Sequence, residues 1–151
     1  MAVARRLETL AGDEPAQRAQ ALNNLANRLS EAGRRDEALE TAQQVAGLYQ
    51  KLAEANEAAY TPDLAMSLSN LAIRLSEAGR RNEALETAQE AVDLRRALAE
   101  ANEVAYTPDL TMSLNNLATF LAEAGRRDEA LEVAQQATGL YQKLEIGRAH
   151  V

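Results

Sequence analysis

Glutamate and arginine side chains recur in this chain at a fixed spacing, and their chemistry is the first candidate for a function. Paired carboxylates can carry out acid–base catalysis, and paired guanidinium groups can bind acidic ligands. Copies repeated at one period are more typical of helix-end electrostatics and of ion pairs between the two kinds of side chain. We therefore interpret both sets as structural: Glu31, Glu77 and Glu123; Glu37, Glu83 and Glu129; Arg34-Arg35, Arg80-Arg81 and Arg126-Arg127.

Other groups that catalysis uses are scarce. The chain contains no cysteine, which removes thiol nucleophiles and thiolate metal ligands, and its one histidine is His150. It also lacks a glycine-rich phosphate loop. We therefore predict that the protein is not an enzyme and has no catalytic residues, no cofactor and no metal site.

The elements that position these side chains are repeats. Gly33, Gly79 and Gly125 are spaced 46 residues apart, and each lies within a nearly identical sequence segment. The matching segments are NLANRLSEAGRRDEALE from Asn24, NLAIRLSEAGRRNEALE from Asn70 and NLATFLAEAGRRDEALE from Asn116. Such a period indicates a solenoid, in which each unit buries its apolar face against copies of itself. Abundant helix formers and only 3% aromatic residues favour an all-α chain.

The first helix of the middle unit is predicted over residues 62–78, where apolar residues recur at helical spacing. Thr61 is its expected N-cap, and Pro62 suits the first helical position. Gly79 is expected to end the helix in the left-handed conformation, because glycine has no Cβ to resist a positive φ.

A second helix is expected to begin at Asn82 as its N-cap and to reach about residue 100. Residues 101–107 would then link it to the next unit. Each unit is thus an antiparallel helix pair, and the small residues Ala72, Ala84 and Ala88 would let its two helices approach closely.

Nine positions of the middle unit resemble the signature of a tetratricopeptide repeat. They are Leu68, Leu71, Ala72, Leu75, Gly79, Ala84, Leu85, Ala88 and Ala91. The resemblance covers about residues 16–144, with a period longer than the usual 34 or so. This long variant resembles the repeats of kinesin light chains and the sensor arrays of bacterial STAND-type signalling NTPases. The resemblance implies interaction rather than chemistry.

The predicted fold is an all-α, right-handed α-solenoid of three antiparallel helix pairs with a leading N-terminal helix. Residues 1–144 would form this single domain. Its expected parts are the leading helix at 2–11 and repeats at about 16–60, 62–106 and 108–144. The last seven residues, 145–151, depart from the repeat and match a translation of a common sequencing-library adapter. We expect this tail to be non-native, so that the natural protein would be longer.

The net charge and the hydropathy of the chain argue against two classes of partner, nucleic acid and membranes. The net charge of −7 gives no basic surface for nucleic acid or an anionic membrane. The N-terminal segment lacks the apolar core of a signal peptide, and no apolar run is long enough to span a membrane. We expect a cytoplasmic protein that binds neither nucleic acid nor membrane.

The candidate functional surface is the face of each first helix that points away from the second. In tetratricopeptide repeats this face lines a concave groove, and here it would carry Gln20, Asn23, Asn24, Asn27, Met66, Ser69, Asn70, Ile73, Met112, Asn115, Asn116 and Thr119. Asn24, Asn70 and Asn116 hold the position at which related repeats clamp a peptide backbone, since an amide both donates and accepts. The alternative is that these amides satisfy neighbouring helices or water. The apolar members could contact a partner or fill the core.

The resulting expectation is a protein or peptide interaction scaffold. Two alternatives stay open. Exposed repeat ends could mediate self-association into a homo-oligomer, or the chain could be the sensor or regulatory fragment of a larger signalling NTPase.

Overall fold

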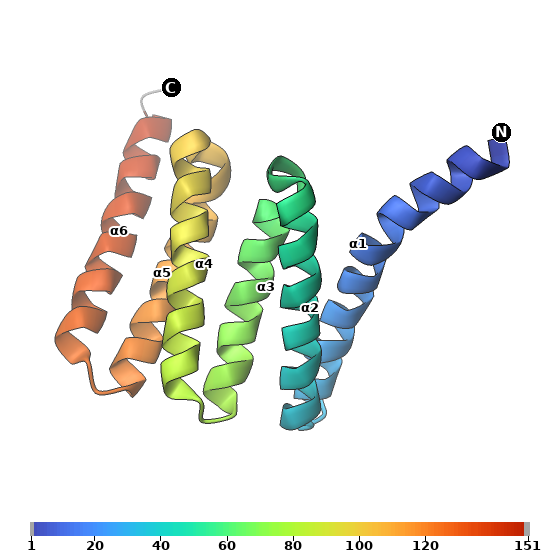
Figure 1. The fold of residues 1–151 in the computed structure, drawn as a ribbon. Coiled ribbons are helices and arrows are strands. Elements are labelled where there is room, and N and C mark those ends of the chain that lie inside the picture. The colour runs from blue at the N-terminus through green and yellow to red at the C-terminus, as the bar shows by residue number, and fades with distance from the viewer. Residues whose placement is uncertain (1, 150–151) are drawn as a thin grey trace.

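The computed structural model of the chain describes the backbone of residues 2–149 and the side chains of residues 14–148. Within that part every regular element is a helix (Figure 1). The six helices are α1 (Ala2–Glu31), α2 (Arg35–Ala55), α3 (Glu57–Glu77), α4 (Arg81–Ala101), α5 (Glu103–Glu123) and α6 (Arg127–Ala149). They form three pairs, in which α1, α3 and α5 are the A helices and α2, α4 and α6 are the B helices.

The turn between the two helices of a pair is the same in all three repeats. Gly33, Gly79 and Gly125 have φ of 78°, 78° and 80°. In the middle repeat the Gly79 amide donates to the Ser76 carbonyl at 3.0 Å and the Arg80 amide donates to the Leu75 carbonyl at 2.9 Å. This pair of bonds closes the helix end around a left-handed glycine. The predicted role of Gly79 is confirmed.

The A helices begin earlier than predicted. Asn56 rather than Thr61 is the N-cap of α3, because its Oδ1 accepts from the Ala59 amide at 3.3 Å. Pro62 consequently lies inside the helix and not at its first position. A proline deprives the carbonyl four residues earlier of its partner, and here that carbonyl belongs to the exposed Ala58.

The same capping shortens the link between repeats. Asn102 caps α5, with Oδ1 accepting from the Ala105 amide at 3.2 Å. The connection predicted over residues 101–107 is therefore wrong: Asn102 alone separates α4 from α5. Because one residue leaves little slack, consecutive repeats are held close together.

Asn82 does not cap α4. Arg80 occupies the N-cap position without a side-chain cap, and Asn82 lies in the first helical turn. Arg80 instead reaches forward to Glu83, with its Nε 3.0 Å from Oε1. A carboxylate in the first turn suits the positive end of the helix dipole.

The N-terminal segment differs from the predicted boundaries. A single helix, α1, runs from Ala2 to Glu31 with Pro15 inside it, where we expected a leading helix at 2–11 and a separate first repeat. The repeat register places Leu10 where Asn56 and Asn102 stand. Leucine offers no side-chain acceptor, so α1 lacks the cap that starts the other A helices.

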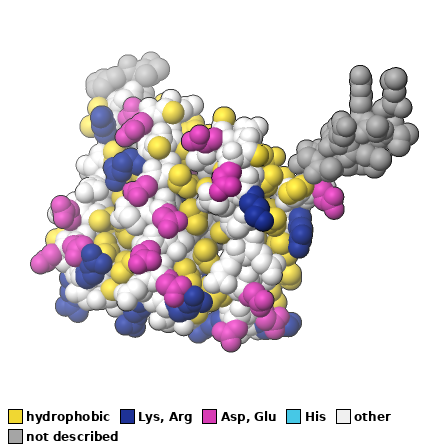
Figure 2. Space-filling view, viewed as in Figure 1, with side chains coloured by type: hydrophobic (Ala, Val, Ile, Leu, Met, Phe, Trp, Pro, Cys, Tyr) yellow, Lys and Arg dark blue, Asp and Glu magenta, His cyan; other side chains and the backbone are white. Residues whose placement is uncertain are grey.

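Successive helices pack on one another along the chain, and α3 also approaches α5. Three clusters of buried apolar side chains lie between the helices. Ala72, Ala84 and Ala88 are at most 3% exposed, as expected for small residues where helices approach closely. The predicted all-α solenoid of three helix pairs is confirmed. On the face shown in Figure 2, acidic and basic side chains are interspersed with apolar ones.

Candidate functional site

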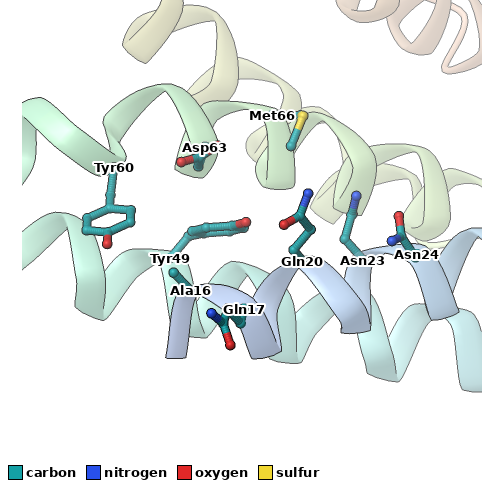
Figure 3. A pocket seen from close by; sticks show the side chains of 9 residues that line it. All are labelled: Ala16, Gln17, Gln20, Asn23, Asn24, Tyr49, Tyr60, Asp63 and Met66. Carbon is teal, nitrogen blue, oxygen red and sulfur yellow. The ribbon is translucent and has the colours of Figure 1, made fainter. Parts of the chain in front are cut away.

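A cavity of about 410 Å³ opens where the first repeat meets the second. Figure 3 shows the side chains of three helices around it: Ala16, Gln17, Gln20, Asn23 and Asn24 from α1, Tyr49 from α2, and Tyr60, Asp63 and Met66 from α3. Polar atoms and aromatic rings therefore share one concave surface. The exposed lining is more polar than apolar, which distinguishes it from the mostly apolar pockets that bind small molecules and suits it to hydrogen-bonding groups.

Four of the predicted site residues line this cavity. Gln20 and Asn24 are exposed, Asn23 is half-buried, and the Met66 side chain is 38% exposed. Met66 is thus available for contact rather than buried in the core. These side chains lie on the facing surfaces of two A helices.

Three prominent cavity residues were missed in the sequence analysis. Tyr60 and Asp63 belong to the Tyr-Thr-Pro-Asp segment that we interpreted only as a helix start, and Tyr49 comes from a B helix. The sequence did contain a signal for these residues. Tyr-Thr-Pro-Asp recurs at residues 106–109, whereas the residue one repeat period after Tyr49 is Arg95. A segment that is kept in successive repeats, next to a position that changes, can be recognised from the sequence alone.

Tyr49 is the most buried member of the cavity lining, with 6% of its surface exposed. Its ring lies between the helices, and its hydroxyl end points toward Gln20 in Figure 3. Burial raises the pKa of Tyr49 above its ordinary value, and the negative charge of Asp63 and then Tyr60 raise it further. Asp63 takes part in none of the five ion pairs among the described side chains.

Hydrogen bonds between neighbouring A helices engage several of the predicted amides. The Asn70 Nδ2 donates to the Asn23 Oδ1 at 3.2 Å. Arg74 donates from Nη2 to the Asn27 Oδ1 at 3.3 Å and from Nη1 to the Ser30 Oγ at 2.8 Å. Of the three repeated asparagines, Asn70 thus makes the kind of contact with a neighbouring helix that the alternative describes.

The remaining predicted residues lie outside the cavity. Ser69 Oγ is 3.4 Å from Ser113 Oγ, which links α3 to α5, and Ile73 packs against a core cluster. Met112 is 51% exposed, and Thr119 Oγ1 donates to the Asn115 carbonyl at 3.0 Å. Asn115 is exposed and Asn116 is half-buried.

The first arginine of each recurrent pair forms an ion pair with a recurrent glutamate. The ion pairs Arg34–Glu37, Arg80–Glu83 and Arg126–Glu129 each have an N–O distance of 2.5 Å. Hydrogen bonds from Arg80 and Arg126 lower the pKa of Glu83 and Glu129, respectively. Glu77 accepts from Arg74 at 3.0 Å, and Glu123 accepts from Ser76 at 3.2 Å. These contacts support the structural interpretation.

Among the described residues, no group of three or more His, Cys, Asp or Glu side chains is arranged to hold a metal ion. None of the helices described is both long and apolar enough to cross a membrane.

Comparisons with known proteins agree with the observed architecture. A family model described as tetratricopeptide repeat matches residues 18–57, 64–102 and 110–145. Crystal structures of nearly identical TPR-like repeats, from a protein of Podosopora anserina assigned as a kinesin light chain, are similar to this chain. One, a Q17M variant, is 25% identical with a TM-score of 0.70, and the other is 26% identical with a TM-score of 0.68.

These similarities cover 95% and 93% of this chain but 63% of each solved chain. The chain therefore spans less than two thirds of their length. No curated protein matches it.

Proposed function

Because the chain belongs to the tetratricopeptide repeat family, we propose that it is an interaction scaffold that binds a protein or peptide segment on its A-helix face. The cavity between α1 and α3 carries this proposal, since it combines exposed amides with two tyrosines. Tyrosine supplies contact area with a polar end, and aromatic anchors dominate many interfaces. Amides can meet both the N–H and the C=O of an extended peptide.

The binding surface is centred on the first two repeats. Asn24 is exposed at the cavity, whereas Asn70 already donates to Asn23. An amide that is engaged inside the protein must give up that bond before it can serve a ligand, which lowers its net contribution. Among Asn24, Asn70 and Asn116, Asn24 is therefore the residue best placed to contact a peptide backbone.

A display selection with random peptides, using the full chain as bait, tests the proposal. Selected peptides should bind the parent and lose about fivefold in affinity with Asn24→Ala, as expected for one lost hydrogen bond. Tyr60→Ala should weaken them by tenfold or more, which is on the order of an aromatic hot spot. Fluorescence anisotropy gives the dissociation constants, and circular dichroism verifies that each variant is folded.

Matched controls lie outside the cavity. Asn82→Ala removes an exposed amide from α4, and Tyr141→Ala removes a tyrosine that is 47% exposed on α6. Neither should change peptide affinity. If no peptide is selected, or if the cavity variants bind like these controls, the A-helix face is not the binding surface.

Self-association is a second candidate, favoured by the exposed face of α6. Leu131 and Tyr141 are 59% and 47% exposed, while their counterparts in α2, Leu39 and Tyr49, are 7% and 6% exposed against the next repeat. A second copy could cover this face as α3 covers α2. Sedimentation velocity at increasing protein concentration would detect it, and Tyr141→Glu should abolish any dimer. A concentration-independent monomer would reject this candidate.

A further inference from the structure

The second repeat junction provides an internal comparison for the cavity at the first. One repeat period relates Tyr49, Tyr60 and Asp63 to Arg95, Tyr106 and Asp109. The tyrosine and aspartate of the A helix are retained, and only the B-helix residue changes, from tyrosine to arginine. The two junctions thus present similar surroundings with and without a guanidinium group.

Arg95 is buried at the second junction, with 7% of its surface exposed. Its Nη1 donates to the Ser113 Oγ at 2.7 Å and to the Asp109 carbonyl at 3.3 Å. Burial lowers the pKa of Arg95, and the negative charge of Asp109 opposes that effect. Desolvating a guanidinium is costly unless acceptors and a countercharge are present. This junction supplies both.

The first junction keeps these acceptors but has no arginine of its own at that position. Ser67, the counterpart of Ser113, is 2% exposed, and its Oγ donates to the Leu64 carbonyl at 2.8 Å. Asp63 lines the open cavity and forms no ion pair with any described side chain. Asp109 also forms no ion pair with a described side chain, and its charge acts on Arg95 at longer range. The Asp63 carboxylate therefore lines a concave space beside Tyr49, the residue that stands where the next repeat has the cationic Arg95.

We infer that the cavity at the first junction binds an arginine side chain of the peptide partner, with Asp63 as its countercharge and the rings of Tyr49 and Tyr60 as its walls. The inference rests on the proposed function and specifies its ligand. A guanidinium forms short, charge-assisted bonds to a carboxylate and stacks on aromatic rings. Asp63 is the only charged residue among the nine in the lining, so an acidic side chain would meet repulsion there. The net charge of −7 also favours a basic partner.

Short capped peptides test this inference directly by NMR titration of the full chain. Acetyl-Ala-Arg-Ala-amide should shift the side-chain amide signals of Gln20, Asn23 and Asn24 in a saturable way at low salt. Acetyl-Ala-Gln-Ala-amide and acetyl-Ala-Glu-Ala-amide should not. Acetyl-Ala-Lys-Ala-amide should bind more weakly than the arginine peptide, because an ammonium lacks the planar fork.

Two variants locate the cation site. Asp63→Asn should weaken the arginine peptide about tenfold, as expected for loss of a charged acceptor. Tyr49→Arg should block the site, because it reproduces the internal arginine of the second junction. Asp36→Asn makes the same change of charge at an exposed position of α2 and should leave affinity unchanged. Thermal melts establish that each variant is folded.

The outcomes separate this inference from the proposed function. Equal shifts with the arginine and glutamine peptides, or unchanged affinity in Asp63→Asn, would overturn the arginine site. If display selection still yields peptides sensitive to Asn24→Ala and Tyr60→Ala, but not enriched in arginine, the scaffold proposal survives and the ligand assignment fails. If neither experiment detects binding at the cavity, both fail.

Discussion

The Asn70 side chain donates a hydrogen bond to the Asn23 side chain at 3.2 Å, joining α3 to α1 across the face proposed to bind a partner. This contact gives two of the three repeated asparagines, Asn70 and Asn24, different roles. Asn70 links neighbouring repeats, while Asn24 is exposed and lines the cavity. Stability and binding should therefore respond to different asparagines.

We expect Asn70→Ala to lower the free energy of unfolding by about 0.5 to 1.5 kcal/mol, the usual net value of one intramolecular hydrogen bond. Asn24→Ala should change it by less than about 0.5 kcal/mol, because that side chain is exposed. Urea denaturation measures both. Equal destabilisation by the two variants would show that the contact between α1 and α3 contributes nothing specific.

Replacing Gly79 tests the strain of the turn alone. Its φ is 78°, and a Cβ added there would meet no heavy atom within 4 Å, so any penalty comes from the backbone conformation. Gly79→Val should cost about 2 kcal/mol or more, and Gly79→Asn about 1 kcal/mol or less, because asparagine tolerates the left-handed region. Thermal denaturation compares the two, and similar melting temperatures would refute the conformational explanation.

A larger side chain at Ala72 tests whether this residue lies where two helices pack closely. Ala72 is 1% exposed, so Ala72→Leu should cost about 1 to 3 kcal/mol by forcing helices apart. Ala58→Leu adds the same atoms at an exposed position of α3 and serves as the control. If chemical denaturation shows the two variants equally stable, Ala72 does not lie on a close helix contact.

The raised pKa of Tyr49 predicts a pH dependence of stability. Folded Tyr49 keeps its proton to a higher pH than it does in the unfolded chain, whose tyrosines titrate near pH 10. Its contribution is therefore fully present below about pH 10 and is lost as the pH rises through the raised pKa. We expect stability to fall less steeply between about pH 9 and about pH 11 in Tyr49→Phe than in the parent.

Tyr141→Phe is the control for that pH dependence, because Tyr141 is 47% exposed. Its urea denaturation curves should follow those of the parent across the range. Parallel behaviour of the parent and Tyr49→Phe would contradict the role assigned to burial of Tyr49.

The sequence by itself determined the helical class, the three repeated pairs and the glycine turns, because these depend on periodicity and on local backbone preference. Gly79 illustrates this: few residues other than glycine accept its positive φ, so its role can be read without knowing its neighbours. The helix starts were less predictable. Thr61-Pro62 and Asn56 both offer start signals, and the structure uses the earlier one.

Only the tertiary structure decided which polar residues face a cavity and which face each other. Asn23 and Asn70 are 47 positions apart, and Tyr49 reaches the cavity from a B helix. Such contacts depend on how one repeat is rotated and shifted on the next, which arises from packing over the whole junction. A repeat pattern shows that two positions are equivalent, but stacking determines whether an amide is engaged by its neighbour, as Asn70 is, or lies open beside the cavity, as Asn24 does.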